Sequence, residues 1–436
     1  MSDLKSVAQH AVECAKKYGA QDASAKIDRA KSTDISWRKE QIENIESAVT
    51  SELVLELFVD GRKGNFRSSD VRHESVEAFI RDAVSMTRLL EADPAAMLPD
   101  PSLYANRANI DLELYDSSIT QLTPNDLVEM SVNLEAECKK FSDLDIFDIS
   151  SGARMSLYEY YHVNTNGFEG AAQKSRVSGG CSITVTDGDK KTSGSEGHSA
   201  RFISDLRKPE LIAAKAAQNC RYRIGAKKIS SKVRTILVDR DVTNFLWYYL
   251  SPLNGYSFIN KDTIYLDKIG KMIGSPLVDI HDKPFIKRGD NSQLFDSDGI
   301  STKELTIIDH GRLETIHLDM YCANKLKMKA TGSRTNVVFT PGKRSLNEMI
   351  SDIKDGIYVL DLAGGNADPT TGDYSFGIYG VAIENGKLTQ NVCEMNISGN
   401  MLELWNNLTE VGNDPCDDTS FWMPSLRFDN VSTSGN

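Results

Sequence analysis

The 436-residue sequence contains no run of about 18 apolar residues, the length that a membrane-spanning helix needs. Its N-terminal stretch, Met1–Tyr18, carries polar residues throughout and lacks the apolar core of a secretory signal. We therefore expect a cytoplasmic protein that makes no contact with a membrane.

The cysteines form no pattern that is typical of a disulfide framework or a zinc site. The seven cysteines are scattered singly, and none forms a CxxC pair. An odd number cannot all pair within one chain, and a zinc ribbon needs closely spaced pairs. These features exclude a disulfide framework and indicate reduced thiols.

Basic residues are fewer than acidic residues. The chain has 50 Lys and Arg against 62 Asp and Glu, for a formal net charge of −12. Because an acidic surface repels phosphate backbones, we expect no nucleic acid partner bound through a broad basic face. Lys325, Lys327 and Lys329 form one short basic stretch, and a solvated helix end explains it better.

Complete catalytic motifs are missing as well. There is no GxSxG nucleophile elbow and no Walker lysine. The dipeptide His73-Glu74 is followed by Glu77 and Ala78 where a zincin needs a second histidine. A helix start with glutamate in its first turn is therefore favoured. The other histidines show no metal-ligand spacing, and we predict no metal site from these residues.

The residues that are present predict an α+β fold in three parts. The first, 1–95, combines an apolar stripe of helical spacing over 3–18 with alternating strand residues near Leu53–Leu57. A turn at 60–64 and a second helix over about 74–91 complete this small α/β unit.

Prolines at 94, 99 and 101 mark a linker, and a middle unit of sheet and helix follows over 110–228. Thr123-Pro124 predicts a helix start, since threonine caps well and proline suits the first position. An Asn166-Gly167 turn joins two expected strands. An alanine-rich helix over 209–222 closes the unit.

The third part, 229–436, is predicted to be β-rich with a few helices. Ser345 and Glu348 form a capping box for a helix running to Gly356. A second helix is expected over 400–412 behind Asn400, and a third over 319–328. The loop Thr371–Ser375 is typical of a simple turn between strands, although a cleft loop offering a hydroxyl and a carboxylate is the alternative.

Several short segments in the last third of the chain occur in a recognisable order. They are Phe295–Gly299, Ala330–Gly332, Thr371–Ser375, Ile383–Gly386 and Glu394–Met401, the last running on to Val411–Asp414. In order and spacing they resemble the PmbA/TldD family, and specifically its PmbA (TldE) branch. Less sharply, the turns at 60–64 and 164–167 extend the resemblance over nearly the whole chain.

The resemblance implies a cytosolic assembly of two related subunits that acts as a peptidase on unfolded peptides. In it, a TldD-like subunit carries an HExxxH helix and a cysteine that bind the metal, so zinc is expected in that partner. Here the corresponding stretch, 242–253, contains neither histidine nor glutamate. Cys416 lies near the position of the metal-binding cysteine but cannot make a site alone. We expect this chain itself to bind no cofactor.

Three hypotheses follow. The first is a non-metal subunit that shapes a substrate cleft and has a TldD-like partner, or forms a homodimer when alone. The cleft residues predicted for it are Thr331, Gly332, Asp373, Ser375 and Asn400. The second is a non-enzymatic regulator that acts on DNA gyrase through protein contacts. The third is an independent peptidase with unrecognised chemistry.

Overall fold

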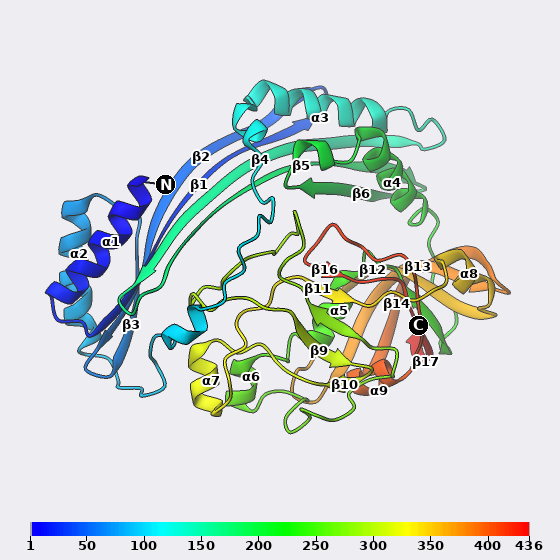
Figure 1. Cartoon of the computed structure of the whole chain (residues 1–436). Coiled ribbons are helices and arrows are strands. Elements are labelled where there is room, and N and C mark those ends of the chain that lie inside the picture. The colour runs from blue at the N-terminus through cyan, green and yellow to red at the C-terminus, as the bar shows by residue number, and fades with distance from the viewer. Residues whose placement is uncertain (1, 436) are drawn as a thin grey trace.

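The N-terminal half is built on one long, curved antiparallel sheet. The computed structural model describes residues 2–435, and in it this sheet has the strand order β3-β2-β1-β4-β5-β6. The strands are β1 (Asp22–Arg38), β2 (Gln41–Val59), β3 (Arg62–Ser68), β4 (Ile146–Asn164), β5 (Glu169–Asp187) and β6 (Lys190–Ala200). The sheet arches over the C-terminal half of the chain (Figure 1).

The pairing of β1 with β4 joins the first two parts of the chain. Lys26 lies opposite His162 and Asp28 opposite Tyr160 in an unbroken register. The predicted units 1–95 and 110–228 therefore contribute three strands each to a single sheet. Nothing local in the sequence signals this pairing, because it joins segments more than a hundred residues apart.

Four helices cover the convex face of the sheet (Figure 1). They are α1 (Ser2–Lys17), α2 (His73–Thr87), α3 (Pro124–Cys138) and α4 (Pro209–Arg221). Alternate strand residues such as Ala25, Ile27 and Leu55 are fully buried beneath α1 and α2. Ile183 and Val185 are buried in the same way with α3 and α4. Because side chains alternate across a strand, the intervening residues face the C-terminal half.

The C-terminal half contains a closed barrel and a smaller sheet. The barrel order is β14-β13-β12-β7-β17-β15, and pairing of β14 with β17 closes it. Its strands are β7 (Lys232–Val238), β12 (Asp355–Ala367), β13 (Asp373–Glu384), β14 (Lys387–Asn400), β15 (Leu408–Val411) and β17 (Leu426–Ser434). The smaller sheet has the order β10-β9-β8-β11-β16. Its strands are β8 (Ile280–Asp282), β9 (Leu305–Asp309), β10 (Arg312–Leu313), β11 (Val337–Phe339) and β16 (Phe421–Trp422).

Short helices connect these strands and fill the core. They are α5 (Thr243–Leu250), α6 (Gly255–Asn260), α7 (Met320–Leu326), α8 (Leu346–Ser351) and α9 (Met401–Asn406). Trp405 of α9 is fully buried and stacks on Tyr249 of α5 with ring centroids 4.1 Å apart. Phe245 packs against the same indole. These aromatic contacts hold the helices inside the barrel end.

The α+β class is confirmed, as are most of the predicted helix starts. Both predicted caps form as reciprocal capping boxes, Thr123 with Asp126 and Ser345 with Glu348. The helix after His73 is shorter than expected and ends at Thr87, and α8 ends at Ser351. No helix in residues 2–435 is long and apolar enough to cross a membrane.

The helix expected over 400–412 is wrong in its second half. Asn400 does cap α9, but that helix ends at Asn406, and Leu408–Val411 form strand β15 beside β17. Asn406 and Asn407 are weak helix formers. The backbone pairing with β17, which brings Leu408 opposite Phe428, outweighs the helical tendency of this segment.

Candidate functional site

The concave face of the long sheet is polar. Ser24, Lys26 and Asp28 of β1 lie beside Tyr158, Tyr160 and His162 of β4. Tyr158 donates to Asp28 Oδ1 at 2.5 Å, and Lys26 Nζ lies 3.1 Å from the same oxygen. These hydroxyl, imidazole, amine and carboxylate groups offer hydrogen-bond donors and acceptors on the side of the sheet that faces the C-terminal half.

Three cavities lie between this face and the C-terminal half. They measure about 490, 380 and 450 Å³. The C-terminal segment 286–298 contributes to all three: Ser297 and Asp298 to the first, Gln293–Phe295 to the second and Ile286–Asp290 to the third. The cavities therefore follow one another along one segment, and we call them together the interdomain cleft.

The first cavity is acidic on the C-terminal side. Asp298 and Asp319 line it opposite Glu56 and Lys63 of the sheet. Asp298 Oδ2 accepts a hydrogen bond from the backbone nitrogen of Met320 at 3.0 Å. Burial raises the pKa of Asp298 from its ordinary value. Glu56 and Lys63 form an ion pair of 2.8 Å, so the sheet side is close to neutral.

The second cavity contains an unpaired amine. Lys174 of β5 lines it together with Tyr160, the linker residues 110–115 and Phe295. Burial lowers the pKa of Lys174 to about 8, and the positive charges of Arg201, Lys26 and Arg176 add to the effect. Within residues 2–435 we find no ion pair or hydrogen bond that engages its amine. An amine held this way is matched to an incoming carboxylate.

The third cavity is rich in arginine. Arg201 is 8% exposed and donates to the backbone oxygens of Ser175 and Asp290, and Nε of Arg201 has no partner within the described chain. Arg176 forms an ion pair with Asp290. Burial lowers the pKa of both guanidinium groups, that of Arg201 to about 10. Asp205, Asp290, Asp417 and Asp418 line the same cavity, so its basic and acidic side chains are balanced in number.

Two of the predicted cleft residues, Thr331 and Gly332, support the first cavity from behind. Thr331 Oγ1 donates to the Ile316 carbonyl at 2.7 Å and accepts from the Leu318 nitrogen at 2.8 Å. Gly332 has φ +86°, and a Cβ there would lie 3.2 Å from Asp296 Oδ2. This glycine lets the backbone approach the buried Asp296, which lies two residues before Asp298.

Asp373, Ser375 and Asn400 lie elsewhere, at one end of the barrel. Asn400 Nδ2 donates to the Thr371 carbonyl at 2.9 Å and to Asp373 Oδ1 at 3.2 Å. Ser375 is exposed on β13, opposite Ser398. Thr371 and Gly372 belong to the turn between β12 and β13, whereas Asp373–Ser375 begin strand β13, so the predicted loop is correct only for its first two residues. The structure thus brings Asp373 and Asn400 together, but it gives no contact between this group and Thr331.

The segment expected to correspond to the metal helix is a core helix here. Helix α5 buries Phe245, Leu246 and Tyr249 completely. Cys416 is 6% exposed, and burial raises the pKa of its thiol to about 11. In residues 2–435, Cys416 belongs to no group of potential metal ligands.

The residues that line the cleft were not picked out from the sequence. Lys174 and Arg176 occupy alternate positions on a strand, which is the pattern of any half-solvated sheet. Their partial burial depends on the segment 286–298, which packs beneath the sheet.

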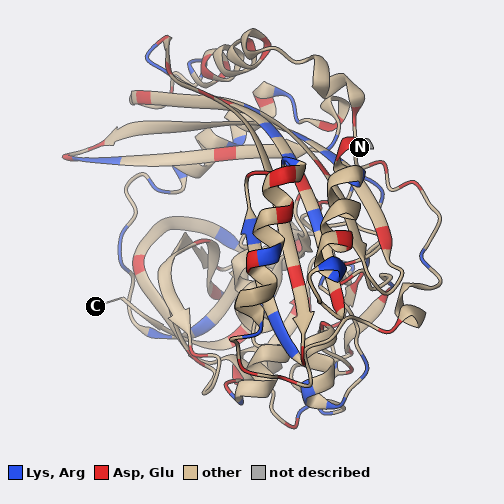
Figure 2. Cartoon of the chain, turned by 90° about the vertical axis from the view of Figure 1, so that its left-hand side faces the viewer, with Lys and Arg blue, Asp and Glu red and all other residues tan. Residues whose placement is uncertain are grey.

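On the side that carries α1 and α2, Figure 2 shows acidic and basic segments mixed along the ribbons without a broad basic patch.

Comparison with known families covers most of the chain. Three family models match in order: PmbA/TldA metallopeptidase domain 1 over 23–87, the central domain over 117–220 and the C-terminal domain over 230–435. The metalloprotease PmbA of Escherichia coli O157:H7 is 28% identical over 402 residues, which is 90% of this chain and 87% of that protein.

Solved structures agree with this assignment. A Bacteroides thetaiotaomicron protein described as a candidate modulator of DNA gyrase is 34% identical, with a TM-score of 0.94 over 99% of both chains. TldE from Thermococcus kodakarensis shares the fold at 19% identity, with a TM-score of 0.88 over 98% of this chain and 100% of that one. The chain belongs to the PmbA/TldD metallopeptidase family.

Proposed function

We propose that this member of the PmbA/TldD family is the substrate-holding subunit of a cytoplasmic TldD/TldE-type peptidase that acts on unfolded peptides. The catalytic zinc belongs to a TldD-like partner, and this chain contributes no metal ligand to the reaction. The core role of α5 supports this division, since its inward side chains are aromatic and aliphatic. Without imidazole or carboxylate ligands, that helix cannot hold a zinc ion that activates water.

The observation that carries the proposal is Lys174 beside the 380 Å³ cavity. Lys174 is half-buried, and a partly desolvated amine without an acidic neighbour is stabilised by a ligand of opposite charge. A peptide supplies such a ligand as its C-terminal carboxylate or as an Asp or Glu side chain. In the neighbouring cavity Arg201 Nε has no partner within the described chain and offers a second donor, whereas Arg176 is already paired with Asp290. The peptide would lie along the cavities in an extended, unfolded form, beside residues 286–298, which themselves contact the sheet through Phe295 and Asp290.

Sheet edges offer a second means of holding an extended peptide. β3 and β6 are the edge strands of the long sheet. Backbone groups at an edge can pair with an added strand and give affinity without reading side chains. The loops at Thr331 and Asp373 remain predicted contributors. Removing them should lower peptide turnover by the complex, and unchanged turnover would remove them from the site.

The test uses the purified chain alone and after mixing with a TldD-like subunit from the same cell. Zinc content and cleavage of an unstructured peptide are measured in each sample. We expect cleavage only in the mixture, with a KM that rises roughly 10-fold or more for Lys174→Met, as for loss of one charged hydrogen bond. Lys303→Met, at an exposed lysine, is the matched control. Equal KM values for the two variants would contradict the role of Lys174.

The gyrase-regulator hypothesis is kept because a close structural relative is described as a candidate modulator of gyrase. A salt-resistant complex of this chain with gyrase, and none with the TldD-like subunit, would favour it. Peptide turnover by the isolated, metal-stripped chain would instead favour an independent peptidase.

A further inference from the structure

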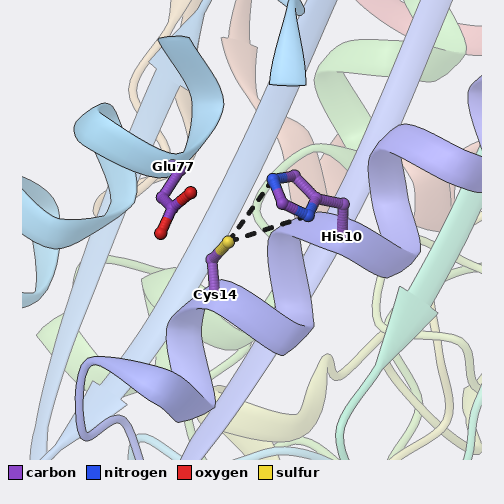
Figure 3. A group of neighbouring side chains, drawn as sticks. All are labelled: His10, Cys14 and Glu77. Carbon is purple, nitrogen blue, oxygen red and sulfur yellow. Dashed lines mark hydrogen bonds between the residues drawn. The ribbon is translucent and has the colours of Figure 1, made fainter. Parts of the chain in front are cut away.

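Helices α1 and α2 bring together a set of metal-binding side chains on the convex side of the sheet. His10 and Cys14 are one helical turn apart on α1, and Glu77 lies on α2 (Figure 3). One ligand atom from each of the three lies within 4.8 Å of the others. This is the group of potential ligands that residues 2–435 contain, and it lies on the opposite face of the sheet from the interdomain cleft.

The distances inside the group are close to those of a bound ion. Cys14 Sγ is 3.5 Å from His10 Nε2 and 3.9 Å from Nδ1. Zinc bonds of about 2.0–2.3 Å in a tetrahedron separate ligand atoms by roughly 3.3–3.8 Å. The sulfur–nitrogen pair already meets this spacing, and the carboxylate needs a movement of about 1 Å.

Both hydrogen bonds that hold the Glu77 carboxylate use the same oxygen atom. Lys17 Nζ and the Tyr18 hydroxyl both bind Oε1, at 2.6 and 2.8 Å. Oε2 is therefore the oxygen that can turn toward an ion, while the bonds to Lys17 and Tyr18 hold the carboxylate in place. Such supporting bonds orient ligands in known metal sites.

The surroundings allow an ion to enter and be retained. Cys14 is 4% exposed, whereas His10 and Glu77 are partly exposed and the neighbouring His73 is exposed. The His73 ring packs against the His10 ring at a tilt of 36°, with centroids 4.6 Å apart, which limits rotation of the His10 side chain. The site is thus buried at its sulfur and open at its nitrogen and oxygen ligands.

We propose that His10, Cys14 and Glu77 bind a divalent transition-metal ion, with zinc as the favoured ion and water in the fourth position. A thiolate, an imidazole and a carboxylate on two helices match the ligand preferences of zinc. Burial and the charge of Glu77 raise the pKa of the free Cys14 thiol, so binding releases its proton to solvent. The ion connects α1 to α2 and is structural.

The experiment titrates the purified full chain with Co²⁺, which reports thiolate ligation by a charge-transfer band in the near ultraviolet. We expect one equivalent to bind with that band and Zn²⁺ to displace it. Cys14→Ser should abolish the band, and Glu77→Gln should weaken binding about 10-fold or more. Cys393→Ser, at a partly exposed cysteine on β14, should leave both unchanged.

Thermal unfolding gives an independent reading. Zn²⁺ should raise the melting temperature of the wild-type chain and of Cys393→Ser, but not of Cys14→Ser, because only a folded site binds the ion. If Cys14→Ser fails to fold, His10→Gln takes its place. The proposal is overturned by Co²⁺ binding without a thiolate band, by a band that persists in Cys14→Ser, or by a zinc effect equal in all variants.

Discussion

Replacing Lys174 with methionine is expected to make the folded chain more stable while weakening its hold on a carboxylate-bearing peptide. Methionine has nearly the length of lysine and no charge, so it can occupy the same space beside Tyr160 and Phe295. It removes an amine that faces three other positive groups. Stabilisation together with loss of function is the usual mark of a residue kept for binding.

The magnitude follows from the pKa. Lys174 titrates near 8 in the folded chain and near 10.5 when unfolded. Between these pH values the unfolded chain binds more protons, so the free energy of unfolding rises with pH through this window. Below pH 8 the full penalty applies, and each pKa unit corresponds to about 1.4 kcal/mol. Removing the charge should therefore add roughly 1–3 kcal/mol at pH 7 and little near pH 10.5.

The assay is urea unfolding of both proteins at pH 7 and pH 10, with Lys303→Met as the surface control. Other groups titrate equally in both proteins, so only the difference between them is used. The difference should shrink toward zero at the higher pH. If Lys174→Met is less stable at pH 7, or if its gain is the same at both pH values, desolvation and positive neighbours do not lower the pKa of this half-buried amine.

Three further predictions concern other parts of the molecule. Gly194→Ala would place a Cβ 2.2 Å from a backbone nitrogen of α4, so it should destabilise by about 3 kcal/mol or more in urea unfolding, whereas Gly197→Ala, with no atom closer than 3.6 Å, should be nearly neutral. Asn400→Ala removes the cap of α9 and should lower stability by about 1 kcal/mol, with Asn400→Asp retaining most of it. Asp296, whose carboxylate accepts three backbone N–H groups, has a pKa raised to about 7 by burial and by Asp298. Its folded state holds a proton that the unfolded chain releases, so its contribution to stability should fall from pH 4 to 7, and Asp296→Asn should abolish that slope in pH-dependent unfolding.

Features that depend on a few neighbouring residues could be predicted from the sequence. The helix starts at Thr123 and Ser345 were predictable because the capping side chain and the backbone group that it binds lie three residues apart. The turn at Asn166-Gly167 falls between β4 and β5 for a similar local reason. The end of α9 could not be predicted in this way, since β17 decides it from outside the segment.

The candidate sites depended on distant contacts. His10 and Cys14 lie one turn apart on one helix, but the third member of the group, Glu77, comes from a second helix that no local pattern connects to them. Lys174 lies in an ordinary alternating strand until segment 286–298 covers it.

By itself, the sequence determined the α+β class, the family signatures of the last third and the absence of metal ligands from the stretch that became α5. Each of these features depends only on residue types or on spacings of a few positions. Only the tertiary structure decided which polar side chains are shielded from solvent, because a side chain is buried only when another part of the chain packs over it. The curved sheet folded over residues 286–298 provides that surface for Lys174, and the packing of α2 on α1 provides it for Cys14.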